Sequence, residues 1–144
     1  MAELHPQLQN DCLLVGRFPL CRLLLMRDAN YPWFILVPDR AGITEIYQLE
    51  PADQQALIRE SSLLASVLAA GFRADKLNIA ALGNLVPQLH VHHVVRYRED
   101  PAWPAPVWGR VPVKPYTDEA LAATLAKLVG ELPEDFEYRA GGIG

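Results

Sequence analysis

Apolar residues in the first forty positions gather into short runs separated by turn-forming residues. The runs CLLVGRF (12–18), PLCRLLLMRD (19–28) and WFILVP (33–38) have strand length, and Gly, Pro, Asp and Asn lie between them. The unbroken apolar run at 33–38 is typical of a strand buried on both faces. We therefore expect three strands here, the second and third paired as a hairpin.

From residue 51 the apolar spacing becomes that of a helix. Proline at position 51 suits a first helical turn, and the acid at position 53 lies near the positive end of the helix dipole. The predicted helix spans 51–72. A second helix is expected from an N-cap at Thr117 to a stop at Gly130. The apolar stripes that predict the two helices are Leu57, Leu64, Val67, Leu68 and Gly71, and then Leu121, Leu125 and Leu128.

Two more strands are predicted between these helices, KLNIAALG (76–83) and QLHVHHVVRY (88–97). Residues 1–10 are polar and predict a short helix or a loop, and the tail 131–144 predicts loose order. The order of strands, helix, strands, helix with short links favours an α+β fold with a mostly antiparallel sheet of five strands. The whole chain, 1–144, is expected to form a single domain.

Composition excludes several classes of partner. The net charge of −4 favours neither a nucleic acid nor an anionic membrane as partner. No apolar run is long enough to span a bilayer, and the N-terminus lacks the pattern of a signal peptide, so a cytoplasmic location is expected. Cys12 and Cys21 show no metal or redox spacing and are expected to be buried free thiols.

The candidate chemistry lies in VPQLHVHHVV (86–95), which holds three of the four histidines. Side chains alternate along a strand, so Gln88, His90 and His92 share one face, while His93 points to the other and is expected to pack under a helix or bond a buried backbone group. Two unpaired imidazoles on one buried face would cost free energy. This pattern therefore favours a functional site.

Three chemistries could use this row of imidazoles. Zinc needs a third or fourth ligand, and His5 is the only other histidine, far off in the polar N-terminal segment, although a carboxylate such as Asp28 could contribute. General acid–base catalysis needs only one imidazole. Nucleophilic catalysis at phosphorus fits the pair best, because one imidazole can attack while the second donates to a phosphate oxygen or the leaving group.

QLHVHHVVR resembles the signature of the histidine triad (HIT) superfamily, in which histidines alternate with hydrophobic residues as H-φ-H-φ-H-φ-φ. In the preferred alignment Gln88 takes the first histidine position, His90 the second, His92 the third, and Arg96 the arginine that often follows. The other alignment makes His90 the first and Val94 the third. The preferred one also places Gly83 and Asn84, six residues before the middle histidine, where the family has a Gly-Gln pair.

The resemblance covers residues 10–97 and implies a HIT-like fold, with a signature strand at 88–97 and a C-terminal extension at 98–144. It implies nucleotide hydrolysis or nucleotidyl transfer at the α-phosphate, on dinucleoside polyphosphates or nucleoside phosphoramidates. Family members act without a metal or cofactor and form homodimers. We expect residues 101–116 at the dimer interface.

By the same resemblance, His90 is the catalytic nucleophile that forms a covalent nucleotidyl-histidine, and His92 donates a hydrogen bond to the phosphate or leaving group. Gln88 and Asn84 position phosphate oxygens and steady the imidazole. The remaining substrate-binding residues implied are Asp28, which grips the ribose with Asn30 as the reserve, and Asn78.

Three features leave alternatives open. The amide of Gln88 cannot titrate, so a catalytically inactive nucleotide-binding or interaction module on the same fold is the second hypothesis. Trp33 occupies a position where the family has a further histidine, and a core role is expected for it. Trp103 and Trp108 either stack a base over the site or pin the proline-rich segment to the sheet or to a second subunit.

Overall fold

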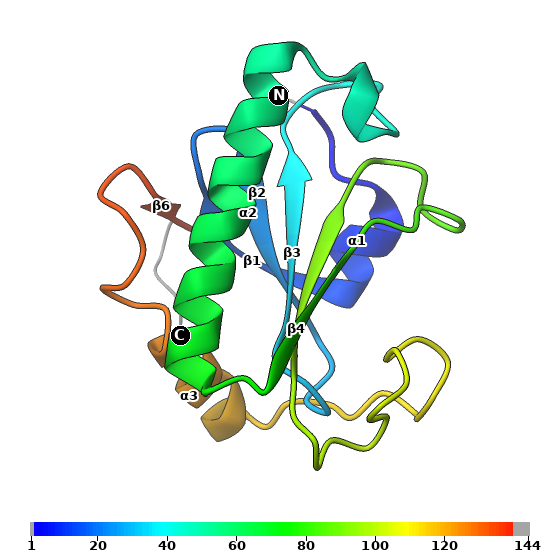
Figure 1. Cartoon of the computed structure of the whole chain (residues 1–144), viewed down its shortest axis with the longest axis vertical. Helices are drawn as coiled ribbons and strands as arrows, with labels where there is room; N and C mark the ends of the chain where they lie inside the picture. Colours follow the sequence, from blue (N-terminus) through cyan, green and yellow to red (C-terminus); the bar gives the residue numbers. More distant parts are fainter. Residues whose placement is uncertain (1, 140–144) are drawn as a thin grey trace.

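The computed structural model describes residues 2–139, which form one six-stranded sheet with a long helix across one face (Figure 1). The strand order is β4-β5-β3-β2-β1-β6, and every pairing is antiparallel. The strands are β1 (Cys12–Arg17), β2 (Cys21–Met26), β3 (Trp33–Pro38), β4 (Lys76–Ala80), β5 (Val91–Arg96) and β6 (Glu137–Tyr138). The helices are α1 (Pro6–Asp11), η1 (Ile46–Gln48), α2 (Pro51–Phe72) and α3 (Asp118–Ala126).

The predicted α+β class and the five predicted strands are confirmed, and so is the long helix with its bounds at Pro51 and Phe72. The second helix ends earlier than predicted, at Ala126, because the chain there changes to single hydrogen-bonded turns before Gly130. The predicted hairpin of the second and third strands is β2 with β3, paired from Cys21 opposite Pro38 to Leu25 opposite Phe34.

The prediction of a loosely ordered tail is wrong for part of that segment, because a sixth strand forms there. Tyr138 pairs with Gly16 and Glu137 with Arg17, at the outer edge of β1. Gly16 permits this contact, since a Cβ at that position would lie 2.3 Å from the carbonyl oxygen of Glu137 and 2.8 Å from the ring of Phe136. Residues 140–144 of the tail lie outside the described residues.

The signature strand is shorter than the predicted 88–97, because β5 begins at Val91. Its ladder to β3 starts with Val91 opposite Leu36, and its ladder to β4 ends with Ala80 opposite His92. The backbone of Leu89 instead donates to the carbonyl of Ile43, outside the sheet. The segment 88–90 therefore precedes the strand. Of the three histidines of the motif, His92 and His93 lie within β5 and His90 lies just before it.

The sheet buries two separate apolar clusters, one on each face. On one face α2 supplies Leu57, Leu64, Leu68 and Phe72 to the larger cluster. The opposite face carries α1 and the segment 102–108, which pack against Trp33, Ile35 and Val94. No helix among residues 2–139 is long and apolar enough to cross a membrane.

Both cysteines are free and buried, as predicted. Cys12 lies opposite Met26, whereas Cys21 lies opposite Pro38, so the two thiols occupy opposite ends of the β1–β2 hairpin. Burial raises the pKa of the Cys12 thiol to about 12, which keeps it protonated at neutral pH.

A buried ion pair closes the end of β5. The guanidinium of Arg96 binds Asp100 at 2.8 and 3.0 Å and Asn78 Oδ1 at 2.7 Å, and it lies 5.7 Å from the ring centres of Tyr31 and Trp103. The Asp100 carboxylate also accepts backbone N–H groups of residues 97, 102 and 103. Burial acts to raise the pKa of Asp100, but these hydrogen bonds outweigh it and lower that pKa. Asp100 thus fixes the start of the segment that leads to Trp108.

Replacing Asp100 with Asn should lower the free energy of unfolding by about 3 kcal/mol, because the buried guanidinium of Arg96 would lose its counter-charge. Denaturant unfolding measures this loss. The neighbouring Glu99→Gln, at an exposed position, should change stability by less than about 0.5 kcal/mol. Equal stabilities for the two variants would contradict the importance assigned to this ion pair.

Candidate active site

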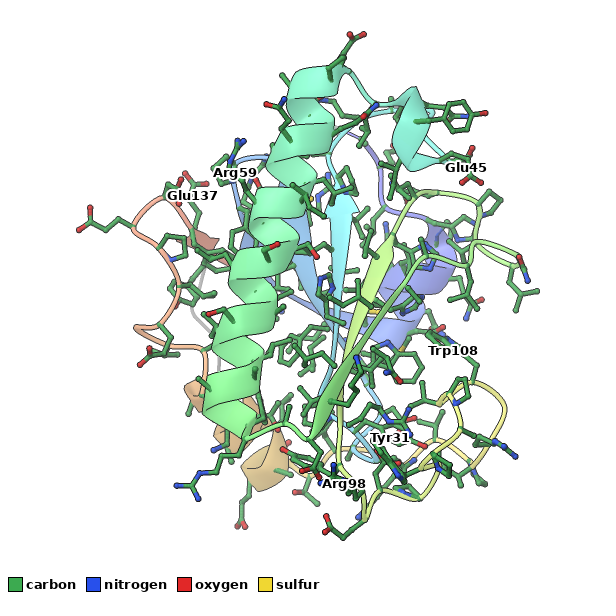
Figure 2. All side chains as sticks on the ribbon, viewed as in Figure 1. Tyr31, Glu45, Arg59, Arg98, Trp108 and Glu137 are labelled. Atoms are coloured by element: carbon green, nitrogen blue, oxygen red, sulfur yellow. The ribbon has the colours of Figure 1, made fainter. Side chains whose placement is uncertain are left out.

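A cavity of about 630 Å³ lies on the α1 face of the sheet, at the start of β5. Three segments surround it: the N-terminal segment with α1, the loop that follows β4, and the segment that carries Trp108. Figure 2 shows Trp108 on the α1 side of the sheet. The lining residues are His5, Gln7, Leu8, Asp11, Met26, Leu82, Gly83, Asn84, Leu85, Val86, His90, His92 and Trp108.

His90 is held by a backbone carbonyl. Its Nδ1 lies 2.7 Å from the carbonyl oxygen of Gln88. A carbonyl can only accept, so Nδ1 carries a proton and donates it. In the neutral imidazole, Nε2 of His90 is then unprotonated and has a free lone pair. His90 therefore has the tautomer that a nucleophile requires.

His92 has the opposite tautomer. The indole Nε1–H of Trp33 donates to Nδ1 of His92 at 3.0 Å, so Nδ1 is the acceptor and the proton of the neutral ring lies on Nε2. Burial lowers the pKa of His92 to about 3, and the charges of His90 and His93 act in the same direction. The ring is thus neutral at physiological pH and can offer a hydrogen bond, but it does not carry a positive charge.

The two imidazoles lie against each other and against two indoles. The ring centres of His90 and His92 are 4.8 Å apart. Trp108 packs on His92 at 5.1 Å and on Trp33 at 5.7 Å between ring centres, in both cases nearly edge-on. Trp108 therefore pins its segment to the sheet within this chain and also forms a wall of the cavity. The core role expected for Trp33 is confirmed, with the added hydrogen bond to His92.

Of the predicted binding residues, Asn84 lines the cavity together with Gly83. Gly83 has a φ of +76°, a left-handed conformation that glycine adopts without strain. It turns the loop after β4 over the cavity. The two residues aligned with the family's Gly-Gln pair therefore lie beside His90 and His92.

The side chain of Gln88 is not among the lining groups of this cavity. Its Oε1 accepts the backbone N–H of His5 at 2.8 Å, and its Nε2 donates to the carbonyl of Glu3 at 3.0 Å. The structure thus places this side chain against the N-terminal segment, and its backbone carbonyl against His90. Contact of the side chain with phosphate stays a prediction.

Asp28 and Asn78 also lie outside the described lining of the cavity. Asp28 is buried and accepts hydrogen bonds from Asn30 and from the backbone of Lys114. Asn78 accepts from Arg96. In this structure each residue stabilises a connection between segments, and their contacts with substrate stay predictions.

The sequence predicts that His5 lies far from the site, and that prediction is wrong. The residue lies at the start of α1, where its Nδ1 accepts the backbone N–H of Gln7 at 3.0 Å, and it lines the same cavity as His90 and His92. Proline at position 6 suits the first turn of a helix, but the sequence carries no signal for where α1 packs on the sheet.

His93 points to the opposite face, as predicted. Ser61 Oγ–H of α2 donates to its Nε2 at 2.7 Å, and its Nδ1–H donates to the carbonyl of Val91 at 3.1 Å. Burial lowers the pKa of His93 to about 4, and the bond to Val91 opposes this shift in part. Its role is to join α2 to β5.

The electrostatics of the cavity are simple. Asp11 is the only Asp, Glu, Lys or Arg among its described lining residues. Within residues 2–139, no three His, Cys, Asp or Glu side chains are grouped so that they could hold a metal ion. A phosphate bound there would meet imidazole, amide and backbone N–H donors, with no lysine or arginine.

Comparison with known proteins identifies the class to which this fold and site belong. The HIT domain model matches residues 7–99, which include the whole cavity lining from Gln7 to His92. The chain belongs to the histidine triad family. Proteins of this family are generally nucleotide-binding hydrolases or transferases.

Solved structures of bacterial histidine triad proteins match almost the whole chain. The protein from Marinobacter aquaeolei VT8 is 52% identical with a TM-score of 0.88, over 92% of this chain and 96% of that one. The protein from Bradyrhizobium japonicum is 42% identical with a TM-score of 0.87, over 88% and 95%. That from Sinorhizobium meliloti 1021 is 42% identical with a TM-score of 0.88, over 92% and 98%. No curated protein sequence matches the chain.

The two lowered histidine pKa values predict a fall in stability with acid. Below the ordinary pKa of about 6.5, the unfolded chain binds protons at residues 92 and 93 that the folded protein does not. Each histidine then contributes a loss of about 2 kcal/mol, so the free energy of unfolding should fall by about 3 to 4 kcal/mol from pH 7 to pH 5. Denaturant unfolding across this range measures the change.

The carboxyl groups of Asp39 and Asp100 do not confuse this measurement, because their pKa values are lowered and they titrate below the range. Constant stability from pH 7 to pH 5 would show that His92 and His93 take up protons without unfolding, and it would contradict their neutral, buried state.

Proposed function

We propose that this protein is a nucleotide hydrolase or nucleotidyl transferase that acts at an α-phosphate through a covalent intermediate on His90. The observation that carries the proposal is the pair of opposite tautomers. His90 offers an Nε2 lone pair because Nδ1 donates to Gln88, and His92 offers an Nε2–H because Nδ1 accepts from Trp33. One attacking and one donating imidazole on the same cavity are the groups that displacement at phosphorus needs.

In the first step, Nε2 of His90 attacks the α-phosphorus as the bond from phosphorus to the leaving group breaks. The leaving group takes up a proton from solvent. The attacking ring of His90 gains a positive charge, and its Nδ1–H bond to the carbonyl of Gln88 strengthens as that charge develops. The Nε2–H of His92 donates to a phosphate oxygen.

In the second step, water attacks phosphorus, the phosphorus–nitrogen bond breaks, and Nε2 of His90 recovers its lone pair. The attacking water loses its proton to solvent, and the nucleoside monophosphate leaves. With an alcohol or second phosphate in place of water, the same step is nucleotidyl transfer. Burial lowers the pKa of His92 to about 3, so at neutral pH its ring lacks the additional proton that a general acid would transfer. His92 therefore acts as a hydrogen-bond donor in both steps.

Glutamine at the first histidine position is compatible with this chemistry. The group that steadies His90 is the backbone carbonyl of residue 88, which every amino acid possesses. The identity of the side chain at 88 is therefore free to differ while the nucleophile keeps its tautomer. This reasoning favours an active enzyme over a catalytically inactive nucleotide-binding module.

The charge of the cavity favours nucleoside phosphoramidates over dinucleoside polyphosphates. A phosphoramidate carries about one negative charge at the reacting phosphate, whereas a tetraphosphate chain carries about four. The described lining offers no lysine or arginine to balance the additional charges, and Asp11 repels them. Asp11 would also attract a positively charged amine as the leaving group.

The apolar part of the lining fits the nucleoside. Leu8 is buried and Met26 and Trp108 are half-buried, and together they give an apolar wall, while Leu85, which is 93% exposed, lies at the rim. A base could stack on the indole of Trp108. We propose this wall as the nucleoside subsite, with Asn84 as a donor to the phosphate.

The homodimer, its interface at 101–116 and the cytoplasmic location stay predictions. The indoles of that segment pack inside the chain, Trp103 on Arg96 and Trp108 on His92. Val113, which is 67% exposed, and the exposed prolines of the segment are available for contact with a second copy.

The covalent step can be tested by mixing the protein briefly with adenosine 5'-phosphoramidate and measuring its intact mass. We expect an adenylyl adduct on the wild type and steady release of AMP. His90→Asn, which removes the nucleophile but keeps a side-chain N–H donor for the carbonyl of Gln88, should lose the adduct and at least about 10³-fold in kcat.

Adduct formation and AMP release by His90→Asn at the wild-type rate would overturn the proposal. Absence of both activities from the wild type, with AMP binding retained, would favour the non-catalytic binding module. Circular dichroism of the variant should match the wild type, which separates lost chemistry from lost folding.

The substrate preference is tested by comparing adenosine 5'-phosphoramidate with diadenosine tetraphosphate at the same ionic strength. We expect kcat/KM for the phosphoramidate to be higher by about tenfold or more, because unbalanced charge on the tetraphosphate is repelled.

Asp11→Asn is the matched variant, since an amide keeps an acceptor for Gln7 Nε2 and removes only the charge. In Asp11→Asn the ratio of kcat/KM for the phosphoramidate to that for the tetraphosphate should fall about threefold. Added salt should also lower this ratio in the wild type. A preference for the tetraphosphate in the wild type would contradict the argument from cavity charge and would leave the covalent mechanism in place.

A further inference from the structure

The side chain of Gln88 joins the start of β5 to the N-terminal segment. Both ends of its amide are used, with Oε1 accepting from His5 N–H and Nε2 donating to the Glu3 carbonyl. The amide of Gln88 thus bonds to the backbone of residues 3 and 5 in the way that a peptide group of a neighbouring strand would. They fix the position of the backbone at residue 5 relative to His90, which is two residues from Gln88.

Other bonds hold the same segment ahead of His5. The backbone N–H of Ala2 donates to Asp39 at 2.6 Å, and Arg22 donates to the carbonyl of Ala2. Gln9 of α1 donates to the carbonyl of Leu4 at 2.9 Å. Residues 2–5 are therefore an ordered wall of the molecule, tied to the sheet on one side and to α1 on the other.

The imidazole of His5 has one nitrogen left for a ligand. Its Nδ1 accepts the backbone N–H of Gln7 at the start of α1, so the neutral ring carries its proton on Nε2. The residue is half-buried and lines the cavity of His90 and His92. This ring therefore resembles His92 in its tautomer, with an acceptor satisfied by the protein and an Nε2–H that is a donor.

We infer that His5 is a further substrate-binding residue, whose Nε2–H donates to a phosphate oxygen of the substrate, and that Gln88 is the positioning residue that presents it. The inference rests on the proposed function. The side chain at the first triad position, which His90 does not need, instead brings a third imidazole to the site from the N-terminal segment.

The Nε2–H of His5 is important because the described lining of the cavity has few groups that can bind a phosphate. No lysine or arginine is among the described lining residues, so the phosphate must be held by neutral N–H groups. His92 supplies one such group and Asn84 another. Hydrogen bonds to charged groups contribute more than those between neutral groups, so removal of one donor should be measurable in binding.

The test uses His5→Asn, because the asparagine side chain can still accept the N–H of Gln7 and cap α1, but it lacks an atom in the place of Nε2. We expect KM for adenosine 5'-phosphoramidate to rise about tenfold and the affinity for AMP to fall by a similar factor, with kcat within about twofold. Asn10→Ala, an exposed position on the same helix outside the cavity lining, is the control and should leave all three values unchanged.

The role of Gln88 is tested with Gln88→Leu and with the double variant that combines Gln88→Leu and His5→Asn. If Gln88 acts by placing His5, Gln88→Leu should raise KM while kcat stays within about twofold. The double variant should then be no worse than the more affected single variant. Fully multiplicative losses in KM would show that Gln88 acts without His5 and would overturn that part of the inference.

The outcomes separate this inference from the proposed function. If His90→Asn abolishes turnover and His5→Asn behaves like Asn10→Ala in KM and in AMP affinity, only the role of His5 is overturned. If His90→Asn turns over normally, the proposed function fails, and calorimetric titration of His5→Asn with AMP still tests whether His5 binds a phosphate.

Discussion

The hydrogen bond from the indole of Trp33 to Nδ1 of His92 is the constraint on which the site depends. It joins neighbouring strands, because Trp33 lies opposite Val94 and so is the diagonal neighbour of His92 on the same face of the sheet. The bond uses the only donor of the indole and fixes the proton of the neutral imidazole on the far nitrogen. Burial then keeps the ring neutral, with its pKa lowered to about 3.

The nucleophile His90 needs the opposite tautomer, with its proton on Nδ1, and the late start of β5 provides the acceptor for that proton. Because β5 begins only at Val91, the carbonyl of Gln88 is free of the sheet and accepts Nδ1–H of His90. Had the ladder extended to residue 88, as the sequence predicted, that carbonyl would be a candidate for pairing with a neighbouring strand. The shortened strand and the unprotonated Nε2 of His90 are thus two aspects of one local geometry.

The strand pattern and the alternation of side chains could be predicted from the sequence, since they follow from local periodicity. The separation of His92 from His93 and the helix at 51–72 are of this kind, whereas the place of Gly83 and Asn84 beside the motif came from the family resemblance. The structure differs where distant segments meet. The packing of α1 places His5 on the same cavity as His90, and a sixth strand pairs beside Gly16. Asn78 and Asp28 form hydrogen bonds with other segments of the chain. All of these features depend on tertiary contacts that have no local signal in the sequence.

Long-range proton–nitrogen NMR correlation of the histidine side chains at neutral pH tests the central claim most directly, since it distinguishes the two neutral tautomers of each ring. We predict a proton on Nδ1 of His90 and on Nε2 of His92, with the His92 pattern shifting toward a mixture of tautomers in Trp33→Phe. The same tautomer on both rings, or an unchanged His92 in that variant, would contradict the account.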